Sequence, residues 1–216
     1  MIPSFDFELT NQLPPGTSFW TPDRDEIGDD CFGFFQDGWP ILDIDRNMAQ
    51  EMLDLDFRMV DLVASAAPDP TTFDRVSAAV EGADVEALPT DLQEETALVE
   101  SIRDLGDEPP LYGLEVGVAG LVHALAAAGC FPAASCRGHT ESHSWSKEPV
   151  VYLAADREHA KLLESLIQDS DCGFDIDPDR PELLVLVARS LNATLWLAQA
   201  ILETLNPGDT NQDPLY

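Results

Sequence analysis

The alternation of apolar runs with amphipathic stretches after residue 113 is the feature that most constrains the fold. Three short apolar runs of strand length lie at 131–136, 150–154 and 183–188. Three stretches with apolar side chains at helical spacing lie at 113–128, 157–168 and 191–205. Chains that alternate in this way pack helices against a sheet. We therefore predict an α/β domain over 109–206 and a flexible tail over 207–216.

The preceding segment is predicted to be mainly helical. Asp45 is a candidate N-cap for a helix over about 46–66, where apolar residues recur every three or four positions. A shorter helix is expected over about 72–80. A capping box at Thr90–Gln93 predicts a third helix that ends near Leu105.

Composition changes at Gly106–Pro110, which we interpret as the boundary between an acidic helical region (1–108) and the α/β domain. The predicted class is α+β, with a helical acidic N-terminal half packed on a C-terminal α/β layer that contains a small mixed sheet.

The first 40 residues are predicted to form an irregular arm that is rich in aromatic side chains. Residues 5–9 alternate apolar and acidic side chains, which indicates an edge strand, and Pro14-Pro15-Gly16 indicates a loop. Aromatic residues between 19 and 39 are expected to pack over the core or, alternatively, to form an exposed recognition segment. Residues 40–44 are predicted to form a short strand.

Acidic residues dominate the charge of the chain. It holds 41 acidic and 11 basic residues, for a net charge of −30, of which −21 falls in residues 1–110. Such a field repels phosphate backbones, so nucleic acid is not an expected partner. It attracts a protein with a basic surface. Solubility, a salty cytoplasm and sequence bias are the general explanations for the same excess.

The compartment follows from what the sequence lacks. No apolar run approaches the roughly 20 residues of a membrane span, and residues 1–10 carry no basic stretch typical of a secretory signal. Four cysteines without a spacing pattern indicate reduced thiols. We expect a cytoplasmic protein, and nine arginines against two lysines are typical of a GC-rich bacterial genome.

The segment Ser135–His143 holds the densest local chemistry. Cys136, His139 and His143 have the three- and four-residue separations that allow a compact turn to bind a metal ion. Cys130 or Cys172 could supply a fourth ligand for tetrahedral zinc.

Three other interpretations of this segment stay open. Cys136 could be a nucleophile, with His139 or His143 as its base and the nearby Arg137 lowering its pKa; Glu141 would then be the orienting acid. Ser135, Arg137 and Gly138 could bind a small anion. Alternatively, the segment is a tight turn with a buried cysteine and solvated histidines.

The order of motifs from Ser135 onward resembles the tRNA wybutosine-synthesis methyltransferase (third-step) family. That family has a Ser-Cys-Ser-Gly-Arg turn, a Glu-Pro pair that enters a strand, a Gly-Phe pair after a helix, and a strand that closes on Arg-Ser. The corresponding pieces here, within roughly 113–200, are Ser135–His139, Glu148-Pro149, Cys172-Gly173-Phe174 and Arg189-Ser190.

A looser similarity exists to uncharacterised small bacterial and phage proteins with a Ser-Cys-x-Gly-His turn. The family resemblance implies a shared α/β scaffold, ligand contact by Ser135, Cys136 and Gly138, and S-adenosylmethionine as a cofactor. His139 stands where the family has arginine, and a net charge of −30 is badly suited to binding tRNA.

From the sequence, we expect a cytoplasmic binding protein that is not an enzyme and that captures a basic protein, as an immunity or inhibitor protein of a basic toxin would. The alternatives are a small-ligand or S-adenosylmethionine-dependent enzyme that uses the Ser135–His143 loop, and a zinc-binding protein.

Overall fold

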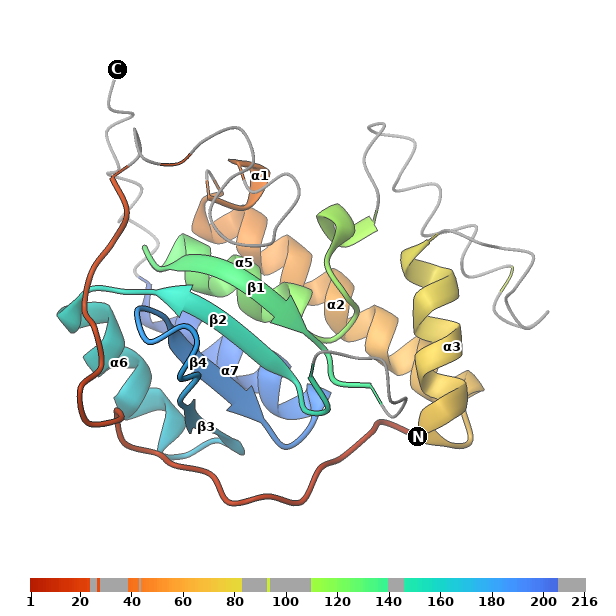
Figure 1. The fold of residues 1–216 in the computed structure, drawn as a ribbon. Helices are drawn as coiled ribbons and strands as arrows, with labels where there is room; N and C mark the ends of the chain where they lie inside the picture. The colour runs from red at the N-terminus through yellow and green to blue at the C-terminus, as the bar shows by residue number, and fades with distance from the viewer. Residues whose placement is uncertain are drawn as a thin grey trace.

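The computed structural model describes residues 1–23, 27, 39–42, 44–82, 93, 110–139 and 146–205. The helices are α1 (Trp39–Leu42), α2 (Arg46–Ala66), α3 (Pro70–Glu81), the 3₁₀ turn η3 (Pro110–Gly113), α5 (Ala119–Ala127), α6 (Arg157–Ile167) and α7 (Leu191–Thr204). The strands are β1 (Phe131–Cys136), β2 (Val150–Ala154), β3 (Cys172–Asp175) and β4 (Leu184–Ala188). This arrangement confirms the α+β class (Figure 1).

The sheet has the order β1-β2-β4-β3, and each neighbouring pair is antiparallel. The small mixed sheet that we expected from the sequence is therefore wrong. A helix between two strands commonly joins parallel neighbours. Here α6 connects β2 to β3, but β4 lies between those two strands. Strands β2 and β3 therefore run parallel to each other but are not hydrogen-bonded neighbours. Every hydrogen-bonded pair of strands in the sheet is antiparallel.

The two faces of the sheet are covered by different parts of the chain. Helices α5, α6 and α7 contribute to the main core, together with side chains such as Val151 and Leu186 that point to their face. Their sequence neighbours Val150 and Val187 point the other way and pack with Phe7 and Leu9. This alternation is the two-residue period of a strand, and it shows why the strand sequences are apolar on both faces.

Residues 1–23 form a strap that runs along the sheet rather than a regular edge strand (Figure 1). Two isolated antiparallel bridges join Ser4 to Ser190 and Thr10 to Phe174. The predicted strand at 5–9 is therefore not formed, although its alternation is correct: Asp6 and Glu8 are exposed, whereas the residues beside them are half-buried.

Part of the aromatic arm packs on the body of the protein, as one of the two expectations proposed. Phe19 packs against the main core, and the Arg157 guanidinium lies over its ring at 4.4 Å from the centroid. Trp20 donates from its indole N–H to the carbonyl of Glu182 at 2.7 Å. The aromatic residues at 32–35 lie outside the described residues.

Most helix predictions are confirmed, and the predicted cap at Asp45 is formed. Asp45 caps α2 by accepting from the amides of Asn47 and Met48, and Ser190 caps α7. Helix α3 begins two residues earlier than predicted, with Asp69 as its N-cap. The third helix, predicted from Thr90 to Leu105, lies outside the described residues apart from Gln93, as does nearly all of the predicted domain boundary.

Three local predictions are wrong. Residues 39–42 form one helical turn, α1, where a strand was expected at 40–44. Strand β3, which is only four residues long, was not predicted. Helix α5 starts at Ala119 rather than Gly113, since Gly113 and Gly117 adopt φ values of 77° and 89° that no helix allows.

Gly120 on α5 lets α2 approach closely, and Gly117, just before α5, lets α7 do the same. A Cβ atom on Gly120 would lie 2.6 Å from Leu53 Cδ1, and one on Gly117 would lie 2.7 Å from Leu191 Cδ1. Among the described residues, no helix is both long and apolar enough to cross a membrane.

This close approach encloses the carboxylate of Asp56, which is fully buried on α2. Its two oxygens accept from the amides of Gly117 at 2.6 Å and Gly120 at 2.8 Å, so a side chain of α2 caps the start of α5. Burial raises the pKa of Asp56 from 3.8 to about 7, and the two amide donors only partly oppose this effect.

We expect Asp56→Asn to change how stability depends on pH. Between about pH 4 and pH 7 the folded protein holds a proton on Asp56 that the unfolded chain has lost, so this group's stabilising effect falls as pH rises through that range. The asparagine variant lacks this pH dependence. It also loses one of the two hydrogen bonds to the amides of Gly117 and Gly120, which lowers its free energy of unfolding by about 1 kcal/mol. Urea unfolding should show the largest advantage of wild type near pH 5 and a smaller one near pH 8.

Asp61→Asn, at an exposed position of the same helix, is the control and should keep a constant difference from wild type. A wild-type advantage over Asp56→Asn that grows from about pH 5 to about pH 8 would contradict this account.

Candidate metal centre

The candidate site lies at the end of β1, where the chain turns sharply. Gly138 has a φ of 78°, and a Cβ atom there would lie 2.5 Å from the carbonyl oxygen of Lys147. Only glycine fits this turn. The turn brings the two arms of the loop together, and the His139 amide donates to the Ser146 carbonyl at 3.4 Å.

Arg137 points from this turn into the protein, where only 2% of its side chain is exposed. Its guanidinium is paired with Glu81 through Nη1 and lies with Nε 3.5 Å from Asp74 Oδ1. Nη2 also donates to the Asp74 backbone carbonyl at 3.2 Å. Both acids belong to α3, so one side chain joins α3 to the end of β1.

Glu115, just before α5, connects the same turn to the helical layer. Its Oε2 accepts from the Arg137 amide at 2.6 Å, and its Oε1 lies 3.0 Å from His139 Nε2. The other imidazole nitrogen, Nδ1, lies 3.6 Å from Asp74 Oδ1. The His139 ring is therefore held between two carboxylates from different elements.

Negative charge exceeds positive charge in this cluster. Asp74, Glu81 and Glu115 surround one arginine, whose pKa burial would lower but the three carboxylates raise, so it stays protonated. Burial raises the pKa of Glu81, and the contacts with Arg137 and with the Val116 amide only partly oppose this effect. An excess of buried carboxylate charge favours the uptake of a further cation.

Glu115, Cys136 and His139 form a group of metal-ligand type: a carboxylate oxygen, a sulfur and an imidazole nitrogen that all lie within 4.8 Å of one another. In a tetrahedral zinc site the donor atoms lie about 3.3–3.8 Å apart, given bonds of about 2.0–2.3 Å. The second imidazole nitrogen faces Asp74, which is the arrangement that orients metal-bound histidines in known sites.

The structure changes the expected ligand set. Cys136 and His139 are brought together as predicted, whereas His143 lies outside the described residues. Cys130 stands at the other end of β1, roughly 20 Å away along the strand. Cys172 belongs to the helix-facing core, where its thiol donates to the Ala193 carbonyl at 3.4 Å, so neither cysteine joins the site.

Burial limits the other chemistry considered for this loop. The Cys136 side chain is 1% exposed, so a substrate has no path to its sulfur in this conformation. Arg137 is equally enclosed, which leaves its guanidinium unable to meet an anion in solvent. Ser135 is half-buried and Gly138 is buried. The acid proposed to orient the histidine, Glu141, lies outside the described residues.

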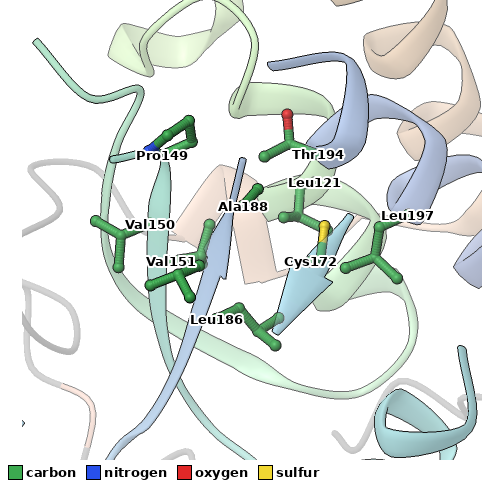
Figure 2. A pocket seen from close by; sticks show the side chains of 10 residues that line it. Leu121, Pro149, Val150, Val151, Cys172, Leu186, Ala188, Thr194 and Leu197 are labelled. Atoms are coloured by element: carbon green, nitrogen blue, oxygen red, sulfur yellow. The ribbon is translucent and has the colours of Figure 1, made fainter. Parts of the chain in front are cut away.

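The small recess between the sheet and helices α5 and α7 is not a ligand site. Figure 2 shows the side chains of Val151 and Leu186 on the strands, with Leu121 and Leu197 on the helices around them. The recess is almost wholly apolar and has no room for a water molecule. It is a packing defect of the core and lacks the polar groups that fix a ligand.

No pattern in the sequence points to the acids that complete the site. Asp74, Glu81 and Glu115 lie 22 to 63 residues before Arg137 in the chain, and each looks like an ordinary solvated carboxylate. Glu81 and Asp74 are seven residues apart, which places them on one face of a helix, but nothing in the sequence shows that Arg137 packs against that face.

Comparison with known proteins finds no matching family model, no similar curated protein and no similar solved structure. The resemblance to the wybutosine-synthesis family therefore gains no support, and S-adenosylmethionine stays a prediction from the sequence alone.

We expect Arg137→Met to lower the free energy of unfolding by about 3–5 kcal/mol, because it leaves buried carboxylates without their cation. Arg189→Met is the control: Arg189 also bonds a distant backbone carbonyl, that of Phe7, but 41% of its side chain is exposed. Its loss should cost about 1 kcal/mol. Urea unfolding of both variants measures the difference, and equal losses would disprove the central role of Arg137.

Proposed function

We propose that this protein binds a divalent transition-metal ion, zinc in preference, through Glu115, Cys136 and His139. The observation that carries the proposal is the convergence of three different ligand types within 4.8 Å at the end of β1. Sulfur and imidazole together are typical zinc ligands, and magnesium or calcium sites use oxygen instead.

The local charge supports this proposal. Nε2 of His139 and Oε1 of Glu115 are 3.0 Å apart, and a metal ion would take the place of the proton between them. Binding would also remove the thiol proton of Cys136, so uptake should release protons and weaken at low pH. His139 and Glu115 are 23% and 31% exposed, which gives an ion a route from solvent.

Three protein ligands leave a fourth coordination position for water, for a further residue of the chain or for a bound molecule. The site is therefore suited to holding an ion near the surface, where the ion can join a second ligand.

We expect the purified protein to bind one zinc ion per chain, measured by calorimetry in competition with a chelator. Cobalt should give the near-ultraviolet absorption of a thiolate-to-metal transition. Because losing even a group that orients a ligand costs about 10–100-fold in affinity, His139→Ala and Cys136→Ser should each weaken binding by at least about 100-fold.

The matched controls are His159→Ala and Cys172→Ser, which alter a histidine also paired with an acid and a buried cysteine away from the site. Zinc binding that these controls reduce as much as the site variants do, or wild-type protein that takes up no zinc, would refute the proposal.

We propose as a second function that the protein captures a protein with a basic surface, as an immunity or inhibitor protein would. A specific observation favours it: on the described surface, exposed acids far outnumber exposed bases. The helical layer alone exposes Asp45, Glu51, Asp54, Asp61 and Glu203. Complementary charge raises the rate at which such partners meet.

Capture from a lysate of the native host tests this second function. We expect a basic protein to be retained at low salt and released as salt rises, because screening weakens exposed charge pairs. An immobilised unrelated protein of similar net charge is the control. Recovery of the same proteins on both supports would show a general effect of charge and would reject a specific partner.

A further inference from the structure

Trp196 on α7 is one of the few large apolar residues that are exposed in the described part of the chain. Its side chain is 64% exposed, on the outward side of α7. It is not a loose surface residue, because its ring meets that of Phe57 on α2 edge to face, with centroids 5.6 Å apart and planes at 71°. The indole is therefore presented to solvent in a fixed orientation, at the seam between two helices.

Acidic side chains border this seam. Asp54 and Asp61 are exposed on α2, three residues before and four residues after Phe57, which places them on the same helical stripe. On α7, Glu203 occupies the corresponding stripe two turns after Trp196 and is exposed. The exposed Arg58 is four residues after Asp54 and three before Asp61, so it lies beside both acids on α2, about 100° around the helix from Phe57.

Polar contacts hold the acids of the seam in position. The Gln50 amide bridges the helices, donating to Asp54 Oδ1 at 3.0 Å and to Gln199 Oε1 at 3.2 Å. Gln199 in turn donates to Glu203 Oε1 at 3.0 Å. Asp54 on α2 and Glu203 on α7 are thus ordered before any partner arrives, which lowers the entropic cost of binding.

From this arrangement we propose that the α2–α7 seam around Trp196 is the docking surface for the basic partner, and that an arginine of that partner stacks on the indole while it pairs with Asp54 or Asp61. This inference rests on the second proposed function. A guanidinium is planar and weakly hydrated, so it can stack on an aromatic ring and pair with a carboxylate at once, whereas a lysine ammonium cannot stack.

The chain itself contains the same type of contact, since Arg157 lies over the Phe19 ring at 4.4 Å. A basic partner would therefore repeat at Trp196 an interaction that the fold already uses, with the larger indole in place of the phenyl ring.

Two synthetic peptides, one of repeated arginine and one of repeated lysine with the same charge, test the proposal by calorimetry at about 0.15 M salt. We expect wild type to prefer the arginine peptide. Trp196→Ala should weaken arginine-peptide binding by about three- to thirty-fold and abolish the preference. Trp196→Phe, which keeps an aromatic face, should retain part of it.

Ile176→Ala is the matched control, because Ile176 is 60% exposed and is likewise flanked by acids, Asp175 and Asp177. Circular dichroism should show that every variant is folded. If wild type binds neither peptide, the proposed capture of a basic partner fails. If wild type binds but Trp196→Ala and Ile176→Ala behave alike, the capture stands and the docking surface is wrong.

Discussion

A single enclosed guanidinium sets how the helical and sheet parts of this protein meet. Arg137 follows the last residue of β1, yet its charged end lies against α3 and is held by Glu81 and Asp74. A guanidinium cannot lose its charge, so burying it costs stability unless carboxylates face it, and the position of α3 and the end of β1 therefore depend on each other. The turn at Gly138 and the placement of Cys136 and His139 follow from this anchoring.

The short segment from Glu115 to Gly117 extends that dependence to the rest of the helical layer. Each of its three residues takes part in a hydrogen bond that a carboxylate accepts. Glu115 accepts from the Arg137 amide, the Val116 amide donates to Glu81, and the Gly117 amide donates to Asp56. One polar network therefore includes the start of α5, the ion pairs between α3 and Arg137, and the candidate ligand Glu115. Buried networks of this kind give a unique arrangement when each member has a partner.

Local patterns were enough to predict the parts of the fold that local physics decides. Helices with a clear cap and a long amphipathic face, such as α2 and α7, were predicted to within a residue or two, and so were β1, β2 and β4. Strand β3 and the late start of α5 were not, because tertiary packing overrides weak local preference there. For the site, Cys136 and His139 were identified by their spacing, whereas Glu115 and Asp74 come from distant parts of the chain and only the fold brings them near.

The strap has a consequence for the order in which the chain assembles. Its anchoring contacts join residues that are 151, 162 and 182 positions apart, through Leu13, Trp20 and Phe7. Closing such long loops is entropically costly until their targets exist, so these contacts form late in folding. Residues 7–20 of the strap would thus be synthesised well before residues 164–189, and they would find their place only after those partners exist.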